Sequence, residues 1–176
     1  MKSSKRFIYI AAALGVMLLI FYFSSQPYHK QDLKPVLGGV VNIEGLEERL
    51  SGFSFSYAGG EVSVERKGVA GFLEFFIRKG AHFAIFFALG WFLMAGLGLF
   101  IKNAFLSMSL SAFIIAAYAV SDEIHQHFTG NRTPLFQDVV LDTAGGIAGI
   151  LSLWLYRKRK SRLRRSRRKA NMTEIK

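Results

Sequence analysis

Four long apolar segments, separated by polar stretches, dominate the pattern of this chain. They cover residues 7–23, 81–101, 104–120 and 139–156. Within them, only His82 and Asp142 are of the Asp, Glu, Lys, Arg or His type. Each segment is close to the roughly 20 residues that cross a hydrocarbon core about 30 Å thick. Because a backbone in lipid must satisfy its own hydrogen bonds, the pattern predicts an all-α membrane protein with four transmembrane helices.

Two other interpretations of these segments are weaker. A soluble domain with buried helices is disfavoured, because long uncharged runs insert into membranes. The first segment follows Lys2, Lys5 and Arg6, as a signal peptide would. No small-residue cleavage site follows it, since a cut after Ser25 would leave Phe23 where a small side chain is needed. We therefore expect an uncleaved anchor.

Residues 24–80 are too long for a simple connection and carry their own pattern. Aromatic residues alternate with serine over 53–57, and valines alternate with polar residues over 62–64, with two glycines between these runs. This pattern predicts a small β-hairpin, which must pack on other elements to be stable. Residues 43–50 fit a short amphipathic helix, and 71–79 fit an interfacial helix leading into the second span.

The net charge of +11 first suggests a nucleic-acid-binding protein. However, ten of the 13 residues from Arg157 to Lys169 are Lys or Arg, so 13 basic and 12 acidic residues remain elsewhere. We expect this tail to contact anionic lipids of the inner leaflet and to bind no nucleic acid. The chain has no cysteine, which excludes disulfides and thiolate chemistry.

The basic residues also predict an orientation. They are concentrated at the two ends, whereas residues 24–80 carry seven basic and seven acidic side chains. The positive-inside rule then places both termini in the cytoplasm and the 24–80 segment outside. Lys102 and Asn103 would form a tight inner turn. The expected organisation is residues 1–23 as N-terminus and first helix, 24–80 outside the membrane, 81–156 as a three-helix core, and 157–176 as a cytoplasmic tail.

Ionisable residues gather where the start of the second span, the end of the third and the start of the fourth meet. In an alternating topology these three places lie on one membrane face, and such intramembrane groups indicate function by default. A purely structural set of interhelical ion pairs is the alternative. Asp122 and Glu123 are the candidates for acid–base or hydrogen-bonding work. The expected ligand-binding residues are Lys79, His82, Gln126, Arg132, Asp138 and Asp142.

Helical spacing connects this cluster to a packing face. Asp138 and Asp142 are four residues apart, and their stripe continues through Gly145 and Gly149. Small residues let another helix approach closely, so Asp142 should point into the bundle. The string DEIHQH contains metal-ligand types, but on a helix His125 and His127 would project about 160° apart. We expect no metal site and no cofactor.

The ordered set of motifs resembles the VanZ-like family. That family has K-x-x-H-F at the start of one helix, then D-E-x-x-Q, an Arg, and D-x-x-x-[ND]-x-x-G entering the last helix. Here RKGAHFAIFFALG and SDEIHQHFTGNRTPLFQDVVLDTAGGIAG carry these residues, over about 75–156. The resemblance implies a multi-pass protein of the bacterial cell membrane, in a family associated with teicoplanin resistance and without an established reaction.

Three functions remain open from the sequence. The first is an outward-facing polar site for an envelope ligand, namely a lipid headgroup, a cell-wall precursor or a glycopeptide. The second is an enzyme acting on a phospholipid or polyprenyl phosphate, with one carboxylate as general base. The third is a structural or partner-binding protein, in which the polar cluster clamps helices together.

Overall fold

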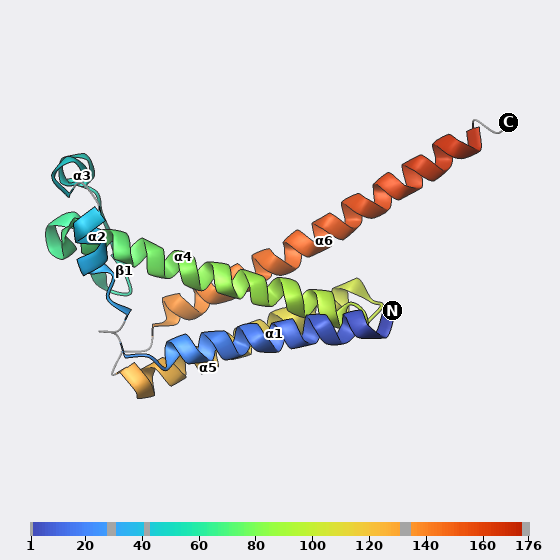
Figure 1. Ribbon diagram of the computed structural model, residues 1–176, viewed down its shortest axis with the longest axis horizontal. Coiled ribbons are helices and arrows are strands. Elements are labelled where there is room, and N and C mark those ends of the chain that lie inside the picture. The colour runs from blue at the N-terminus through green and yellow to red at the C-terminus, as the bar shows by residue number, and fades with distance from the viewer. Residues whose placement is uncertain (1, 28–30, 41–42, 131–134, 174–176) are drawn as a thin grey trace.

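The computed structural model describes residues 2–27, 31–40, 43–130 and 135–173 (Figure 1). Four of its helices are long and apolar enough to cross a membrane, which confirms the predicted fold class. These are α1 (Lys2–Ser24), α4 (Val64–Leu97), α5 (Ala104–Gly130) and α6 (Phe136–Thr173). Between α1 and α4 lie α2 (Lys34–Val40), α3 (Ile43–Leu50), β1 (Ser54–Tyr57) and β2 (Gly60–Ser63).

The bounds of α4 differ from the prediction at both ends. The expected interfacial helix over 71–79 is continuous with the second span, because α4 begins at Val64. Ser63 caps this start by accepting a hydrogen bond from the Arg66 amide, and Gly68, with φ of 67°, interrupts the first turns. The helix ends at Leu97 rather than at residue 101. The connection to α5 is therefore residues 98–103, longer than the expected tight turn.

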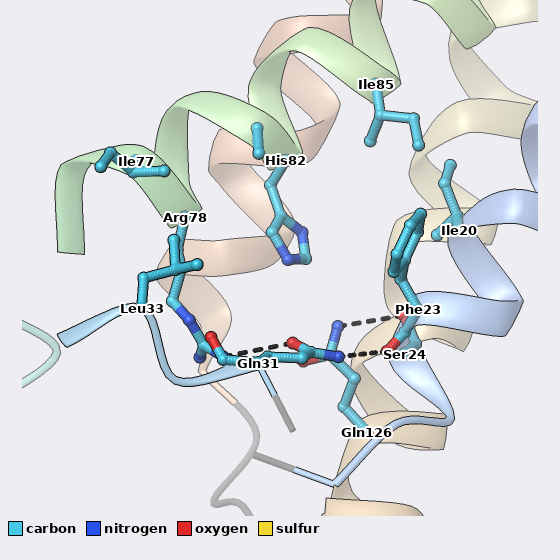
Figure 2. Close-up of a pocket in the computed structure, with 11 residues that line it drawn as sticks. Ile20, Phe23, Ser24, Gln31, Leu33, Ile77, Arg78, His82, Ile85 and Gln126 are labelled. Carbon is cyan, nitrogen blue, oxygen red and sulfur yellow. Dashed lines mark hydrogen bonds between the residues drawn. The ribbon is translucent and has the colours of Figure 1, made fainter. Parts of the chain in front are cut away.

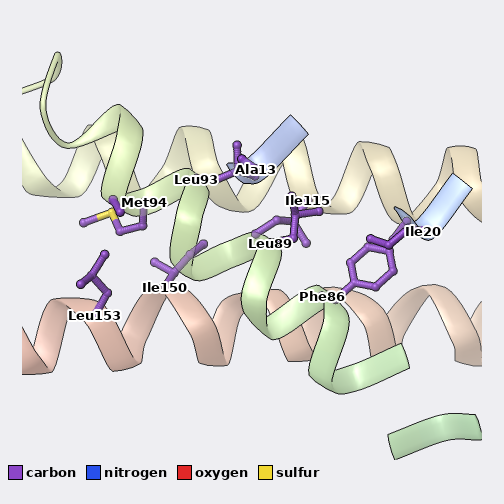
Figure 3. Close-up of a cluster of buried hydrophobic side chains, with 11 residues drawn as sticks. Ala13, Ile20, Phe86, Leu89, Leu93, Met94, Ile115, Ile150 and Leu153 are labelled. Carbon is purple, nitrogen blue, oxygen red and sulfur yellow. The ribbon is translucent and has the colours of Figure 1, made fainter. Parts of the chain in front are cut away.

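The bundle core lies between α1, α4, α5 and α6 (Figure 3). Phe86 and Leu89 on α4 and Ile115 on α5 are fully buried there. Burial of large apolar side chains stabilises the fold by about 1.5–3 kcal/mol each. The core runs along the helices through these residues: Ala13, Ile20, Leu93, Met94, Ala95, Ala119, Ile150 and Leu153.

Glycines bring α6 and α4 into direct backbone contact. A Cβ atom on Gly149 would overlap the carbonyl oxygen of Phe87, and one on Gly90 would overlap that of Gly146. A Cβ on Gly145 would lie 2.5 Å from the carbonyl oxygen of Phe83. Only glycine permits this approach, so the predicted packing face of the last helix is the surface that meets α4.

The predicted hairpin and short helix are both present. Strands β1 and β2 pair antiparallel with Phe55 opposite Val62, and Ala58 and Gly59 form the turn with φ of 52° and 76°. Positive φ at both central residues is typical of the type I′ turns that join two-residue hairpins. Val62 packs with Val69 and Phe72 of α4, so the hairpin gains its stability from that helix as expected.

The basic tail is helical and continues α6, and Figure 1 shows its C-terminal half projecting away from the bundle. Arg157 turns back toward the end of α4 and donates to the carbonyl oxygens of Met94 at 3.5 Å and Ala95 at 3.4 Å. Lys158 lies over the Trp154 ring, 4.6 Å from its centroid. These contacts fix the point at which the tail leaves the bundle.

Candidate functional site

Polar side chains from four helices meet at one end of the bundle. In Figure 1 this is the end where α1 and α5 finish, α6 begins, and the small elements lie beside α4. The structure brings together these sequence-predicted residues: Lys79, His82, Asp122, Glu123, Gln126, Asp138 and Asp142. Arg132 lies outside the described residues.

Asp138 on α6 joins α4 and the hairpin. Its carboxylate accepts hydrogen bonds from Lys79 Nζ, which lies 2.6 Å from both oxygens. It also accepts from Tyr57 Oη at 2.5 Å. Burial, followed by this contact with a carboxylate, raises the pKa of the Tyr57 phenol above its usual range. The hairpin therefore docks on the start of α6 through a neutral phenol that donates to a charged acceptor.

Asp122 is held by α1. Ser24 Oγ donates to Asp122 Oδ1 at 2.6 Å, and Gln126 Nε2 donates to Oδ2 at 2.9 Å. The i, i+4 spacing of Asp122 and Gln126 on α5 makes the second contact possible. Immediately after the end of α1, Ser25 Oγ lies 3.0 Å from His125 Nε2. The end of the first helix is thus part of the site.

Glu123 has a different partner from its neighbour. Its Oε1 accepts a hydrogen bond from the Leu135 amide at 2.7 Å, immediately before α6. Backbone N–H groups at a helix start have no partner within the helix, so a carboxylate there satisfies one of them. Glu123 therefore ties the end of α5 to the beginning of α6.

His82 and Asp142 face each other across α4 and α6. His82 Nδ1 lies 3.4 Å from Asp142 Oδ2, at the long end of hydrogen-bond distance. Asp142 is buried, and among the described residues its Oδ1 has no hydrogen-bond partner. Asp142 is therefore the carboxylate, within the described part of the site, that has a buried oxygen without a partner.

Two cavities lie side by side at this end of the molecule. The first, of about 420 Å³, is mostly apolar and lies between α1 and α4, as Figure 2 shows. The His82 imidazole projects into it. The second, of about 580 Å³, lies beneath the hairpin and is lined by five basic and three acidic side chains. The cavities share Arg78, His82 and Gln126.

Sequence reasoning missed several residues of the site. Arg78 lies between the cavities, 3.2 Å from both Glu74 Oε1 and Gln31 Oε1. Three further residues of the site come from α1 and from the segment between α1 and α4, which the motifs do not include: Ser24, Gln31 and Tyr57. The alternation of Phe55 and Tyr57 with serine predicted that Tyr57 lies in a strand. No local signal shows that its hydroxyl group contacts Asp138 on α6.

The family assignment follows from the sequence as a whole. Residues 8–157 match the family model described as VanZ/LLP1. The chain belongs to the VanZ/LLP1 family. This match confirms the resemblance and extends it beyond the motif region to the first helix and the segment between α1 and α4. Neither the curated proteins nor the solved structures contain a match to the chain.

The VanZ/LLP1 match spans all the side chains of the polar cluster, from Ser24 on α1 to Asp142 on α6. It also spans the hairpin and both cavities. The four apolar helices make this family member a multi-pass membrane protein.

Proposed function

We propose that this VanZ/LLP1 protein binds an anionic envelope lipid, with the hydrocarbon chain in the apolar cavity and the headgroup in the polar cavity. The observation that carries the proposal is that an apolar and a charged cavity share one wall, formed by Arg78, His82 and Gln126. An amphiphilic ligand needs both cavities, because its hydrocarbon chain is apolar and its headgroup is charged. The apolar cavity alone would suit any apolar molecule, and the polar cavity alone would suit any small anion.

The apolar cavity suits a hydrocarbon chain. Ile20, Phe23, Ile77 and Ile85 line it, so most of its surface is aliphatic or aromatic. Phe23 and Ile77 are also exposed at the surface of the helices, which allows a chain to enter from the surrounding lipid. Its volume is within the range of about 300–1,000 Å³ that is typical of small-molecule sites.

The polar cavity suits an anionic headgroup. Four of its basic residues have acidic neighbours: Arg66 near Glu61, Arg78 near Glu74, Lys79 near Asp138 and Lys34 near Asp32. With Lys67 they make five basic side chains in the lining against three acidic ones, so positive charge predominates there. Guanidinium and ammonium groups are the donors that recognise phosphate and carboxylate. Arg132, which the sequence assigns to the same face, would add another.

The proposed location is the outer face of the bacterial cell membrane, with both termini in the cytoplasm. The basic C-terminal part of α6 supports this orientation, because Lys and Arg accumulate on the cytoplasmic side. The hairpin lies at the other end of the bundle from the start of α1 (Figure 1), and residues of the hairpin and of the end of α1 line the two cavities. The ligand would then be a lipid of the outer leaflet.

The test is the lipid content of the full-length protein purified in mild detergent. We expect native mass spectrometry to show one bound anionic lipid, and titration to show stronger binding of phosphatidylglycerol or a polyprenyl phosphate than of a neutral lipid. Comparison of these two anionic lipids distinguishes a phospholipid from a wall-precursor carrier. Preferential binding of teicoplanin, or equal affinity for neutral and anionic lipids, would contradict the proposal.

A structural clamp is the second candidate, and the contacts of two carboxylates favour it over catalysis. Asp122 uses both oxygens on Ser24 and Gln126, and Glu123 uses Oε1 on the Leu135 amide. Glu123→Gln keeps an acceptor for that amide, whereas Glu123→Ala removes it at a cost of about 1–3 kcal/mol. A clamp predicts normal abundance for Glu123→Gln and reduced abundance for Glu123→Ala. A general base predicts that Glu123→Gln abolishes turnover at normal abundance.

A further inference from the structure

We propose that His82, Asp122 and Asp142 form a binding site for one divalent transition-metal ion. One ligand atom from each of these residues lies within 4.8 Å of the others. The three residues come from α4, α5 and α6, so an ion would join the three helices at a single point. The inference does not rest on lipid binding and adds a ligand of a different class.

Burial makes two adjacent aspartates costly without a cation. Asp122 is 4% exposed and Asp142 is 3% exposed. Buried carboxylates require a charged partner, a set of hydrogen bonds or a metal ion. Lys79 is already 2.6 Å from both oxygens of Asp138, one turn before Asp142 on α6. A divalent ion between Asp122 and Asp142 would neutralise both carboxylates.

An unsatisfied oxygen gives an independent indication of a ligand. Asp142 Oδ1 is buried and, within the described part of the chain, has no hydrogen-bond partner. Its other oxygen is 3.4 Å from His82 Nδ1, which is long for a hydrogen bond. Two ligands at about 2.1 Å from one tetrahedral ion are about 3.4 Å apart. The spacing therefore fits two ligands of a shared ion better than a donor and its acceptor.

The surroundings of the cluster have the form of a metal site. Ser24 Oγ and Gln126 Nε2 donate to Asp122, and such hydrogen bonds orient a ligating carboxylate. His82 lines both cavities, so a coordination position not filled by protein would face them. Three protein ligands with one open position are typical of functional rather than structural zinc sites.

The ligand types narrow the choice of metal. Imidazole nitrogen favours zinc and other transition metals, while carboxylate oxygen is also a ligand for manganese. A site with one imidazole and two carboxylates therefore points to Zn²⁺ or Mn²⁺ rather than to Cu(I) or an iron–sulfur cluster, which require sulfur ligands. The sequence predicted no metal site, because His125 and His127 of the DEIHQH string project apart on one helix, and these two histidines are not part of this group.

The test is equilibrium dialysis of the detergent-purified full-length protein against Zn²⁺ or Mn²⁺, with the bound metal measured by mass spectrometry. We expect one ion per chain. Asp142→Asn should weaken binding by about tenfold or more, since even the loss of an outer-shell contact costs 10–100-fold. Glu48→Gln is the control, because it removes one carboxylate charge from an exposed site on α3 that lines neither cavity, and it should leave the ion bound. Equal losses in the two variants would overturn the proposal.

A second measurement keeps the test independent of variant folding. Mn²⁺ bound to the wild-type protein should show nitrogen coupling from one imidazole in pulsed electron paramagnetic resonance. The coupling should disappear in His82→Gln and persist in His125→Gln. Absence of nitrogen coupling in the wild type, or failure to bind either ion at one per chain, would overturn the proposal.

Discussion

Lys79 Nζ lies 2.6 Å from both carboxylate oxygens of Asp138, so this ion pair links the middle of α4 to the start of α6. The side chains are 22% and 18% exposed. The pair is therefore largely shielded from solvent and contributes more than an ordinary surface ion pair. It also borders the polar cavity, since both residues line it.

Lys79→Gln should lower the free energy of unfolding by about 2 kcal/mol, because Asp138 would lose its charged donor in a shielded site. The double variant Lys79→Asp with Asp138→Lys should be more stable than Lys79→Asp alone, because it restores opposite charges at the two positions. Reversible unfolding of the purified protein would measure both. A double variant no more stable than Lys79→Asp alone would show that the pair is not coupled.

Gly149→Ala should destabilise the bundle. The new methyl group would overlap the Phe87 carbonyl oxygen, and overpacking of this kind costs about 1–3 kcal/mol. Gly15→Ala on α1 is the matched control, since a Cβ there meets no atom within 4 Å. It should be neutral or slightly stabilising, because alanine has the higher helix propensity. Similar thermal midpoints for the two variants would contradict the close α4–α6 contact.

Tyr57→Phe should cost about 1 kcal/mol at pH 8 by removing the hydrogen bond to Asp138. The pKa of Tyr57 is raised in the folded protein, so its contribution is complete below the unfolded value near 10. The stabilisation by Tyr57 is lost as the pH rises toward the pKa of Tyr57 in the folded protein, because Tyr57 ionises first in the unfolded chain. Unfolding free energies of both proteins from pH 8 to 11 should therefore converge. A constant difference would contradict the contact.

The orientation can be tested by cysteine labelling, because the chain has no cysteine of its own. Ser56 in β1 and Lys102 in the α4–α5 connection are both exposed. In intact cells, a membrane-impermeant maleimide should label Ser56→Cys but label Lys102→Cys only after permeabilisation. The reverse pattern would place the hairpin and the cavities on the cytoplasmic side.

The sequence predicted the elements and the meeting of the polar residues, but not how those residues pair. Apolar run length located the four spans, and alternation of helix direction brought Lys79, Asp122 and Asp138 to one end. Periodicity gives the face of a residue within its own helix, without showing which helix lies opposite. The contact of Ser24 with Asp122 joins residues 98 positions apart, so no local pattern could predict it.

The sequence could not predict the two cavities either. They depend on how α2 and the hairpin are placed against α4, which is set by packing of side chains such as Phe72 and Val62. Gln31 closes one side of the apolar cavity from a connecting segment with no motif. A cavity is the space that packed elements leave, so it has no signature of its own in the chain.

The most direct test of the lipid-binding proposal fills the apolar cavity. Ala81 lines it, whereas Ala84, three residues further along α4, is exposed and lines neither cavity. Native mass spectrometry of Ala81→Trp should show about tenfold less bound anionic lipid than wild type, a loss of about 1.4 kcal/mol, while Ala84→Trp should retain it. Full lipid retention by Ala81→Trp, or equal loss in both variants, would contradict the account.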